Sequence, residues 1–154
     1  MGYLKSAIVG VLSGALAFTS FPANAGVITS NAEAVRKLDI MLMVTSLRCR
    51  TTSDNFQADY RRFSAAHLSD LNLASRTLQA RLVHSHGQNG AKRALDKISV
   101  GMANEYGQGH PWLNCGQLKQ ATQALARDKD SSHLASAANE LLARSPRGQW
   151  AMAN

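Results

Sequence analysis

The stretch SNAEAVRKLDIMLMVTSLRC, residues 30–49, carries the strongest helical signal of the chain. Its apolar side chains recur at steps of three and four, which is the spacing of one face of an α-helix. They are Val35, Leu38, Met41, Leu42, Val44 and Leu47. Because residues 40–44 are apolar nearly all round, we expect the most buried helix of the domain here. Ser30 and Glu33 match a capping box, which predicts that this helix begins beside Ser30 and ends near Cys49.

The methionines at 41 and 43 leave an alternative open, since methionine also suits adaptable surfaces that bind partners. Further helical periods follow toward the C-terminus, separated by breaks rich in glycine, asparagine and proline. An aromatic stripe formed by Phe56, Tyr60, Phe63 and His67 is expected in the core. Beyond it, the pattern either continues as the same helix or restarts after a kink near Ser69.

The sequence predicts an all-α fold, a single small bundle of about five helices, because no strand-like alternation occurs after residue 25. The predicted helices are residues 30–49, about 53–82, 91–106, 116–127 and 132–144, with breaks at 84–90, 107–111 and 128–131.

The first 25 residues have the anatomy of a bacterial signal peptide. Lys5 supplies a short positive region, residues 7–18 are apolar, and Ala23-Asn24-Ala25 places small residues before a cleavage site. An uncleaved anchor is the alternative, but a spanning helix needs about 20 apolar residues, and Pro22 ends this run. We therefore expect cleavage after Ala25, a periplasmic or secreted protein, and no stable membrane span after cleavage.

Residues 26–146 would form the helical domain and residues 147–154 a mobile C-terminal tail. The whole chain has 154 residues, 45% of them hydrophobic, and a net charge of +7. Because the basic residues are scattered, the composition indicates a solvated basic surface. The functional alternatives are an envelope protein, a cell-wall polymer or an anionic lipid surface as partner. Nucleic acid is not an expected partner of an exported protein.

Cys49 and Cys115 are the two cysteines of the chain. An exported protein meets an oxidising environment, so we expect them to form one disulfide. Closing a loop of this length stabilises the fold by about 4 kcal/mol in the chain-entropy model. The alternative is a free catalytic thiol beside His110, five residues before Cys115.

The segment MANEYGQGHPWLNC, residues 102–115, is the best candidate for a surface groove. Its aromatic and polar side chains would suit a sugar or a peptide; they are Glu105, Tyr106, His110, Trp112 and Asn114. The alternative is a loop between helices, held by the disulfide, whose tryptophan fills the core.

His84 and His86 form an H-x-H pair that could hold Zn²⁺ or Cu²⁺. No third ligand lies nearby in the sequence, although the distant His67, His110 or His133 could supply one. We therefore expect no metal and no cofactor. Hydrolase, metalloprotease, P-loop and dinucleotide motifs are missing from the sequence, so no catalytic residue is assigned.

Two stretches, LDIMLMVTSLRCRTTSDNFQADYRRF (residues 38–63) and SVGMANEYGQGHPWLNCGQLK (residues 99–119), resemble a group of small exported bacterial helical proteins. Some members carry the label S-adenosyl-L-homocysteine hydrolase. The enzyme of that name is much larger and holds NAD in a Rossmann domain, whereas this chain has neither the length nor the fingerprint. The resemblance implies export and carries over no site residues.

The leading hypothesis is a non-catalytic envelope protein that binds or protects something outside the cytoplasm. One alternative is a pH- or stress-responsive periplasmic chaperone, for which the five histidines could sense acid. A second alternative is a small hydrolase built around Glu105, Tyr106 and His110.

Overall fold

The computed structural model describes residues 23–143, and its regular structure there is entirely helical. The elements are α1 (Ala23–Ser30), α2 (Ala32–Arg48), a short 3₁₀ turn η1 (Cys49–Thr51), α3 (Gln57–Ala66), α4 (Leu68–Glu105), α5 (Cys115–Arg127) and α6 (Ser131–Leu141). The all-α prediction is confirmed, with six α-helices where about five were expected. Most of the predicted signal peptide, residues 1–22, and the predicted tail at 147–154 lie outside the described residues.

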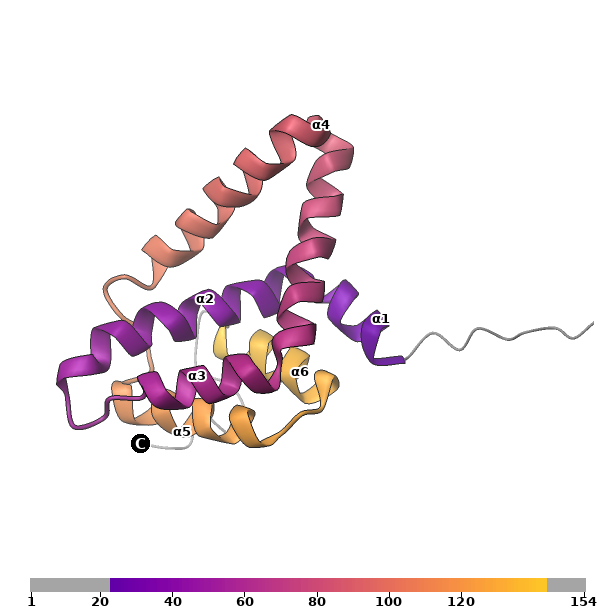
Figure 1. Cartoon of the computed structure of the whole chain (residues 1–154). Helices are drawn as coiled ribbons and strands as arrows, with labels where there is room; N and C mark the ends of the chain where they lie inside the picture. The colour runs from indigo at the N-terminus through magenta and orange to yellow at the C-terminus, as the bar shows by residue number, and fades with distance from the viewer. Residues whose placement is uncertain (1–22, 144–154) are drawn as a thin grey trace, which may run out of the picture.

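Helix α2 forms the centre of the molecule and packs against helices from both ends of the chain (Figure 1). Val35, Leu38, Met41 and Leu42 are fully buried, as the sequence predicted. Leu47 was expected on the same face, but it is 46% exposed, and Thr45 and Ser46 are the buried residues of that turn. The apolar stretch of α2 is therefore buried along one broad face and open on the other.

The capping box predicted at the start of this helix is wrong. Ser30 is the last residue of α1, and its hydroxyl donates to the carbonyl of Val27 at 2.9 Å. The preceding residues are themselves helical, with Ile28 fully buried, so the Ser30 side chain bonds back into α1 instead of capping α2. Helix α2 starts at Ala32 without a side-chain cap.

The aromatic stripe is confirmed as core. Phe56, Phe63 and His67 are buried, while Tyr60 lies at the edge of the cluster. Helix α3 ends at Ala66, because His67 leaves helical geometry (φ −109°, ψ 19°), and α4 starts at Leu68. The second of the two alternatives, a new helix after a kink, is therefore the one observed.

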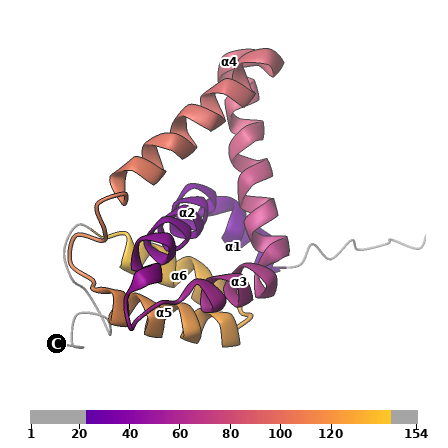
Figure 2. The same cartoon turned by 60° about the vertical axis from the view of Figure 1, so that its left-hand side comes forward.

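Helix α4 rises away from the body, turns sharply, and returns to it (Figures 1 and 2). The turn is made at Gly87, whose φ of +68° and ψ of 172° interrupt two otherwise helical halves. The predicted break at 84–90 is thus real but confined to one residue. His84 and His86 are helical, not in a loop as expected.

Helices α5 and α6 complete the bundle, with α5 along α3 and α6 against α1 and α2. Asn114 and Gln117 form a reciprocal capping box at the start of α5, and the Asp130 side chain caps α6. Helix α6 ends at Leu141, three residues before the expected end at Arg144. No helix within residues 23–143 is long and apolar enough to cross a membrane.

Candidate functional site

Cys49 and Cys115 form the expected disulfide, with their Cα atoms 5.9 Å apart. Cys49 lies in η1 just after α2, and Cys115 is the first residue of α5. Cys49 is buried in the main core. Because both cysteines of the chain are consumed in this bond, the alternative of a free catalytic thiol is wrong.

The candidate groove residues lie between the end of α4 and the start of α5, around this disulfide. Glu105 is the one acid among these five residues, and its side chain is 52% exposed. Its carboxylate is paired with the Nζ atom of Lys37 on α2, at 2.6 Å. The same Nζ lies 5.7 Å from the ring centre of Tyr106. Glu105 therefore fixes the end of α4 to α2.

Tyr106 and His110 stack on one another, with ring centres 5.7 Å apart and planes inclined by 25°. Tyr106 is buried, and this burial, helped by the neighbouring charge of Glu105, raises its pKa to about 12. Its hydroxyl is therefore neutral throughout the physiological range.

His110 uses both ring nitrogens within the fold. Nε2 donates to the carbonyl of Leu141 at 2.8 Å, and Nδ1 accepts the backbone N–H of Leu113 at 3.1 Å. This pattern requires a neutral ring with its proton on Nε2. Burial lowers the pKa of His110, against the opposing effect of the bond to Leu141. The ring is thus kept neutral and has no nitrogen left for proton transfer with a substrate.

Trp112 and Asn114 also serve the local structure. The indole Nε1 of Trp112 donates to the carbonyl of Ala143 at 3.0 Å, and the rings of Trp112 and His110 are nearly perpendicular, with centres 4.9 Å apart. His110 therefore satisfies the carbonyl of the last residue of α6, which has no partner inside the helix, and Trp112 binds a carbonyl two residues beyond it. The Asn114 side chain accepts the N–H of Gln117 at 2.9 Å. Trp112 packs at the edge of the core and does not fill its centre.

A cavity of about 280 Å³ lies beside the disulfide. His110 and Asn114 line it, but Glu105, Tyr106 and Trp112 do not. Its remaining wall comes from Thr45, Arg48, Cys49, Gln108, Gly109, Leu113, Cys115 and Leu118. The structure therefore brings two of the five predicted groove residues to one cavity, and it does not join Glu105 to His110 there.

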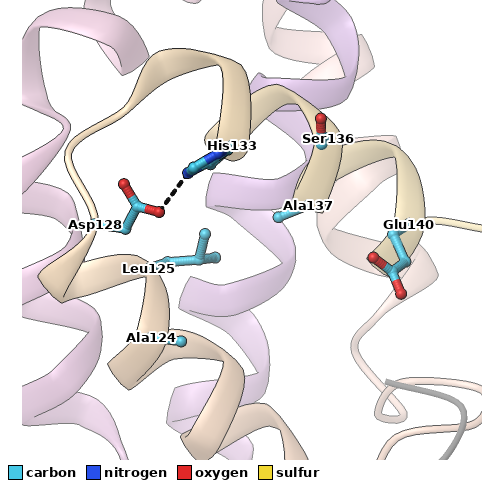
Figure 3. Close-up of a pocket in the computed structure, with 7 residues that line it drawn as sticks. All are labelled: Ala124, Leu125, Asp128, His133, Ser136, Ala137 and Glu140. Carbon is cyan, nitrogen blue, oxygen red and sulfur yellow. Dashed lines mark hydrogen bonds and ion pairs between the residues drawn. The ribbon is translucent and has the colours of Figure 1, made fainter. Parts of the chain in front are cut away.

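A second cavity, of about 340 Å³, lies between α5 and α6 (Figure 3). His133 Nδ1 lies 2.7 Å from Asp128 Oδ2, and Glu140 lies at the other end of the cavity. The hydrogen bond to Asp128 raises the pKa of His133, and bonds to Asp130 and His133 lower that of Asp128. This pair was not predicted from the sequence, although a histidine that follows an acidic turn at the start of a helix was an available signal.

Ser136 lines the same cavity, so serine, histidine and aspartate are present together. In Figure 3 the Ser136 hydroxyl points away from His133. Nucleophilic catalysis needs the serine within hydrogen-bond reach of the histidine, in a site shielded from water. The His133 side chain is 66% exposed, so the pair is a solvated ion pair and lacks the geometry of a catalytic triad.

His67 lies in a third polar cluster, which is buried. Its Nε2 donates to the carbonyl of Leu125 at 2.9 Å, and its Nδ1 is 3.5 Å from Asp70. The Ser131 hydroxyl donates to Asp70 at 3.1 Å. These bonds connect the junction of α3 and α4 to α5 and α6, which is a structural role.

Within residues 23–143, no three His, Cys, Asp or Glu side chains gather closely enough to hold a metal ion. His84 and His86 are two positions apart on an exposed helix, so they project from different sides of it. No protein-family model, curated protein or solved structure matches the chain.

Proposed function

We propose that the protein is exported and acts outside the cytoplasm as a small helical binding module, not as an enzyme. The observation that carries this proposal is the use of the polar groups of residues 105–114 by the fold itself. Glu105 is paired with Lys37, and both ring nitrogens of His110 bond to backbone groups. A general acid or base needs an atom free to exchange a proton with its substrate.

The Cys49–Cys115 bond supports the exported location. Disulfides persist in oxidising compartments such as the periplasm, and they are rare where cytosolic thiols are kept reduced. The signal-peptide anatomy of residues 1–25 agrees with this location.

Intact mass after expression of the full chain in a Gram-negative host tests the proposal. We expect protein in the periplasmic or secreted fraction whose mass begins at Gly26 and which is two hydrogen atoms lighter than the reduced chain. Ala25→Leu should block cleavage because a small residue is required there, whereas Asn24→Leu should be cleaved normally. Full-length protein with two free thiols in the cytosol would refute the proposal.

A pH-responsive chaperone is the second candidate. The position of the neutral His110 ring between Tyr106 and Trp112 favours it. Protonating Nδ1 would abolish its acceptance of the Leu113 N–H and place a charge between Tyr106 and Trp112. The loop would then loosen and expose these aromatic rings.

Near-UV circular dichroism and binding of a hydrophobic dye distinguish the two candidates. A chaperone of this kind loses its near-UV signal and binds dye at about pH 4, while its helices persist. An unchanged near-UV signal at that pH would eliminate the chaperone and leave the static binding module.

A further inference from the structure

We propose that the bend of α4 is a docking surface for anionic phospholipid membranes. We call residues 76–100 the elbow. This inference names the partner of the binding module proposed above and therefore rests on that proposal.

Most of the elbow projects from the body of the molecule, although Arg76 and Arg81 near its start still lie beside α1. The main core cluster includes Leu71 and Ala74 of α4 but no residue of the elbow. Figures 1 and 2 show the two halves of α4 extending away from the bundle and meeting at a bend that lies far from the other helices. A projecting, convex element reaches a flat surface without interference from the rest of the protein, whereas a soluble ligand is better enclosed by a concave site.

The net charge of the described chain is concentrated in this segment. Residues 76–100 contain five basic side chains and one acidic side chain, Asp96. The other residues of the 23–143 range contain nine of each. The rest of the described molecule is therefore balanced, and its whole formal excess of positive charge belongs to the elbow.

The basic side chains of the elbow are available to a partner. All five are exposed, namely Arg76, Arg81, Lys92, Arg93 and Lys97. None of them is paired with an acid among the described residues, whereas Arg36, Lys37 and Arg62 of the body each form an ion pair. Arg81 donates only to a backbone carbonyl, that of Thr29.

An exposed apolar residue favours a lipid surface over a purely ionic polymer. Val100 is 58% exposed and follows Arg93 and Lys97 at helical spacing, so the three share one side of α4. Interfacial helices combine basic side chains that meet phosphates with apolar side chains that enter the headgroup layer.

Both halves of α4 also bury apolar side chains. Leu78 of the first half and Ala91 of the second half are buried within the elbow, and Met102 is buried just beyond it. The elbow therefore combines buried apolar positions with exposed basic side chains.

Vesicle co-sedimentation of the purified oxidised protein tests the proposal. We expect binding to phosphatidylcholine vesicles that contain phosphatidylglycerol, and little binding to phosphatidylcholine alone. The triple variant Lys92→Gln/Arg93→Gln/Lys97→Gln should bind the anionic vesicles about a hundredfold more weakly, at roughly fivefold per basic residue. Binding of the unmodified protein should fall steeply as salt is raised.

The control variant is Arg50→Gln/Arg61→Gln/Lys129→Gln, which removes the same charge from exposed positions of the body. It should weaken binding less than tenfold. Equal losses in the two triple variants would overturn the proposal, because net charge alone would then explain binding. Equal binding to neutral and anionic vesicles would also overturn it.

Two further outcomes separate this inference from the proposed function. Elbow-dependent binding to a soluble polyanion such as heparin, without binding to vesicles, would overturn the lipid assignment and leave the binding module standing. If the exported protein binds neither vesicles nor heparin, the docking proposal fails. The intact-mass measurement still tests cleavage and export independently of that result. A cytosolic, uncleaved protein would remove the proposed function itself.

Discussion

His110 connects the loop before α5 to the end of α6 through its two ring nitrogens. Because the ring must stay neutral to make both bonds, the stability of this connection depends on pH. Because burial lowers the pKa of His110, the unfolded chain binds a proton at a higher pH than the folded chain does. The contribution of His110 to stability is therefore complete above about pH 6.5, the ordinary histidine value. It declines as the pH falls from there toward the lowered pKa of the folded state.

The first prediction concerns this pH dependence. The free energy of unfolding should fall below about pH 6.5, and His110→Gln should reduce the slope by up to one proton per molecule. His133 acts in the opposite direction, because its pKa is raised by Asp128 and its contribution is lost as the pH rises above the same value. Urea unfolding of the oxidised protein between about pH 5 and pH 8, the range in which histidines titrate, measures the contributions of both histidines.

His133→Gln is the matched control for that experiment, since it should alter only the slope above the histidine midpoint. If His110→Gln leaves the slope on the acid side unchanged, the buried, neutral state assigned to His110 is wrong.

A second prediction concerns a carboxylate held between α2 and α3. The Tyr60 hydroxyl donates to Asp39 at 3.0 Å, and Arg36 binds the other oxygen at 3.2 Å. Burial nevertheless raises the pKa of Asp39, so this carboxylate depends on both donors. Tyr60→Phe should lower the free energy of unfolding by about 1–3 kcal/mol, because it leaves a buried acceptor without its partner.

Tyr106→Phe is the control for Tyr60→Phe, because no described residue pairs with the Tyr106 hydroxyl. It should change stability by less than about 0.5 kcal/mol, as an equal-volume change without a lost hydrogen bond does. The free energies of unfolding are measured with urea at about pH 7, where tyrosine hydroxyls are neutral. Equal losses of stability in the two variants would contradict the role given to the bond between Tyr60 and Asp39.

At the scale of elements, α4 depends on a single glycine. Gly87 adopts φ +68° with an extended ψ, a combination that is strained for any residue with a side chain. Gly101 lies in the regular second half of the same helix, and a Cβ there would meet nothing within 4 Å.

The third prediction uses these two glycines as a matched pair. Gly87→Ala should destabilise the protein by about 1–3 kcal/mol through backbone strain. Gly101→Ala should stabilise it by about 0.5–1 kcal/mol, because alanine restricts the unfolded chain and suits a helix. Thermal unfolding of the two variants tests this prediction. If both substitutions shift the Tm in the same direction, the backbone conformation at Gly87 is contradicted.

The same helix shows how far local sequence signals reach. The glycines and asparagine of residues 84–90 predicted a break correctly, because Gly87 and Asn89-Gly90 are turn signals. They did not show that Gly87 alone would make the turn. Residues 88–90 are helical, although Asn89-Gly90 is a turn signal in the sequence.

For the molecule as a whole, contacts between residues far apart in the sequence were predictable in one case and not in others. Cys49 and Cys115 were predictable because two cysteines allow one pairing. The cavity with His133 and Asp128 was not, because it forms only where α5 meets α6. The positive charge of the elbow looked scattered along the sequence, and only the bend in α4 separates it from the balanced body.

The groove residues illustrate the same limit at the candidate site. The composition of residues 102–115 indicated a special segment, and both a groove and a loop held by the disulfide fitted it. The carbonyls of Leu141 and Ala143, supplied by a distant helix end, show that His110 and Trp112 bond to the fold. No local pattern in the sequence identifies those two acceptors.

The helical scaffold is fixed by one disulfide that joins η1, directly after α2, to the start of α5. Thermal unfolding of the purified protein in its oxidised and reduced forms tests this claim. A bond worth about 4 kcal/mol should make reduction lower the Tm by roughly 10–20 °C at neutral pH. Cys49→Ser/Cys115→Ser should reproduce the reduced form. An unchanged Tm after complete reduction would contradict the claim and remove the main structural support for an exported protein.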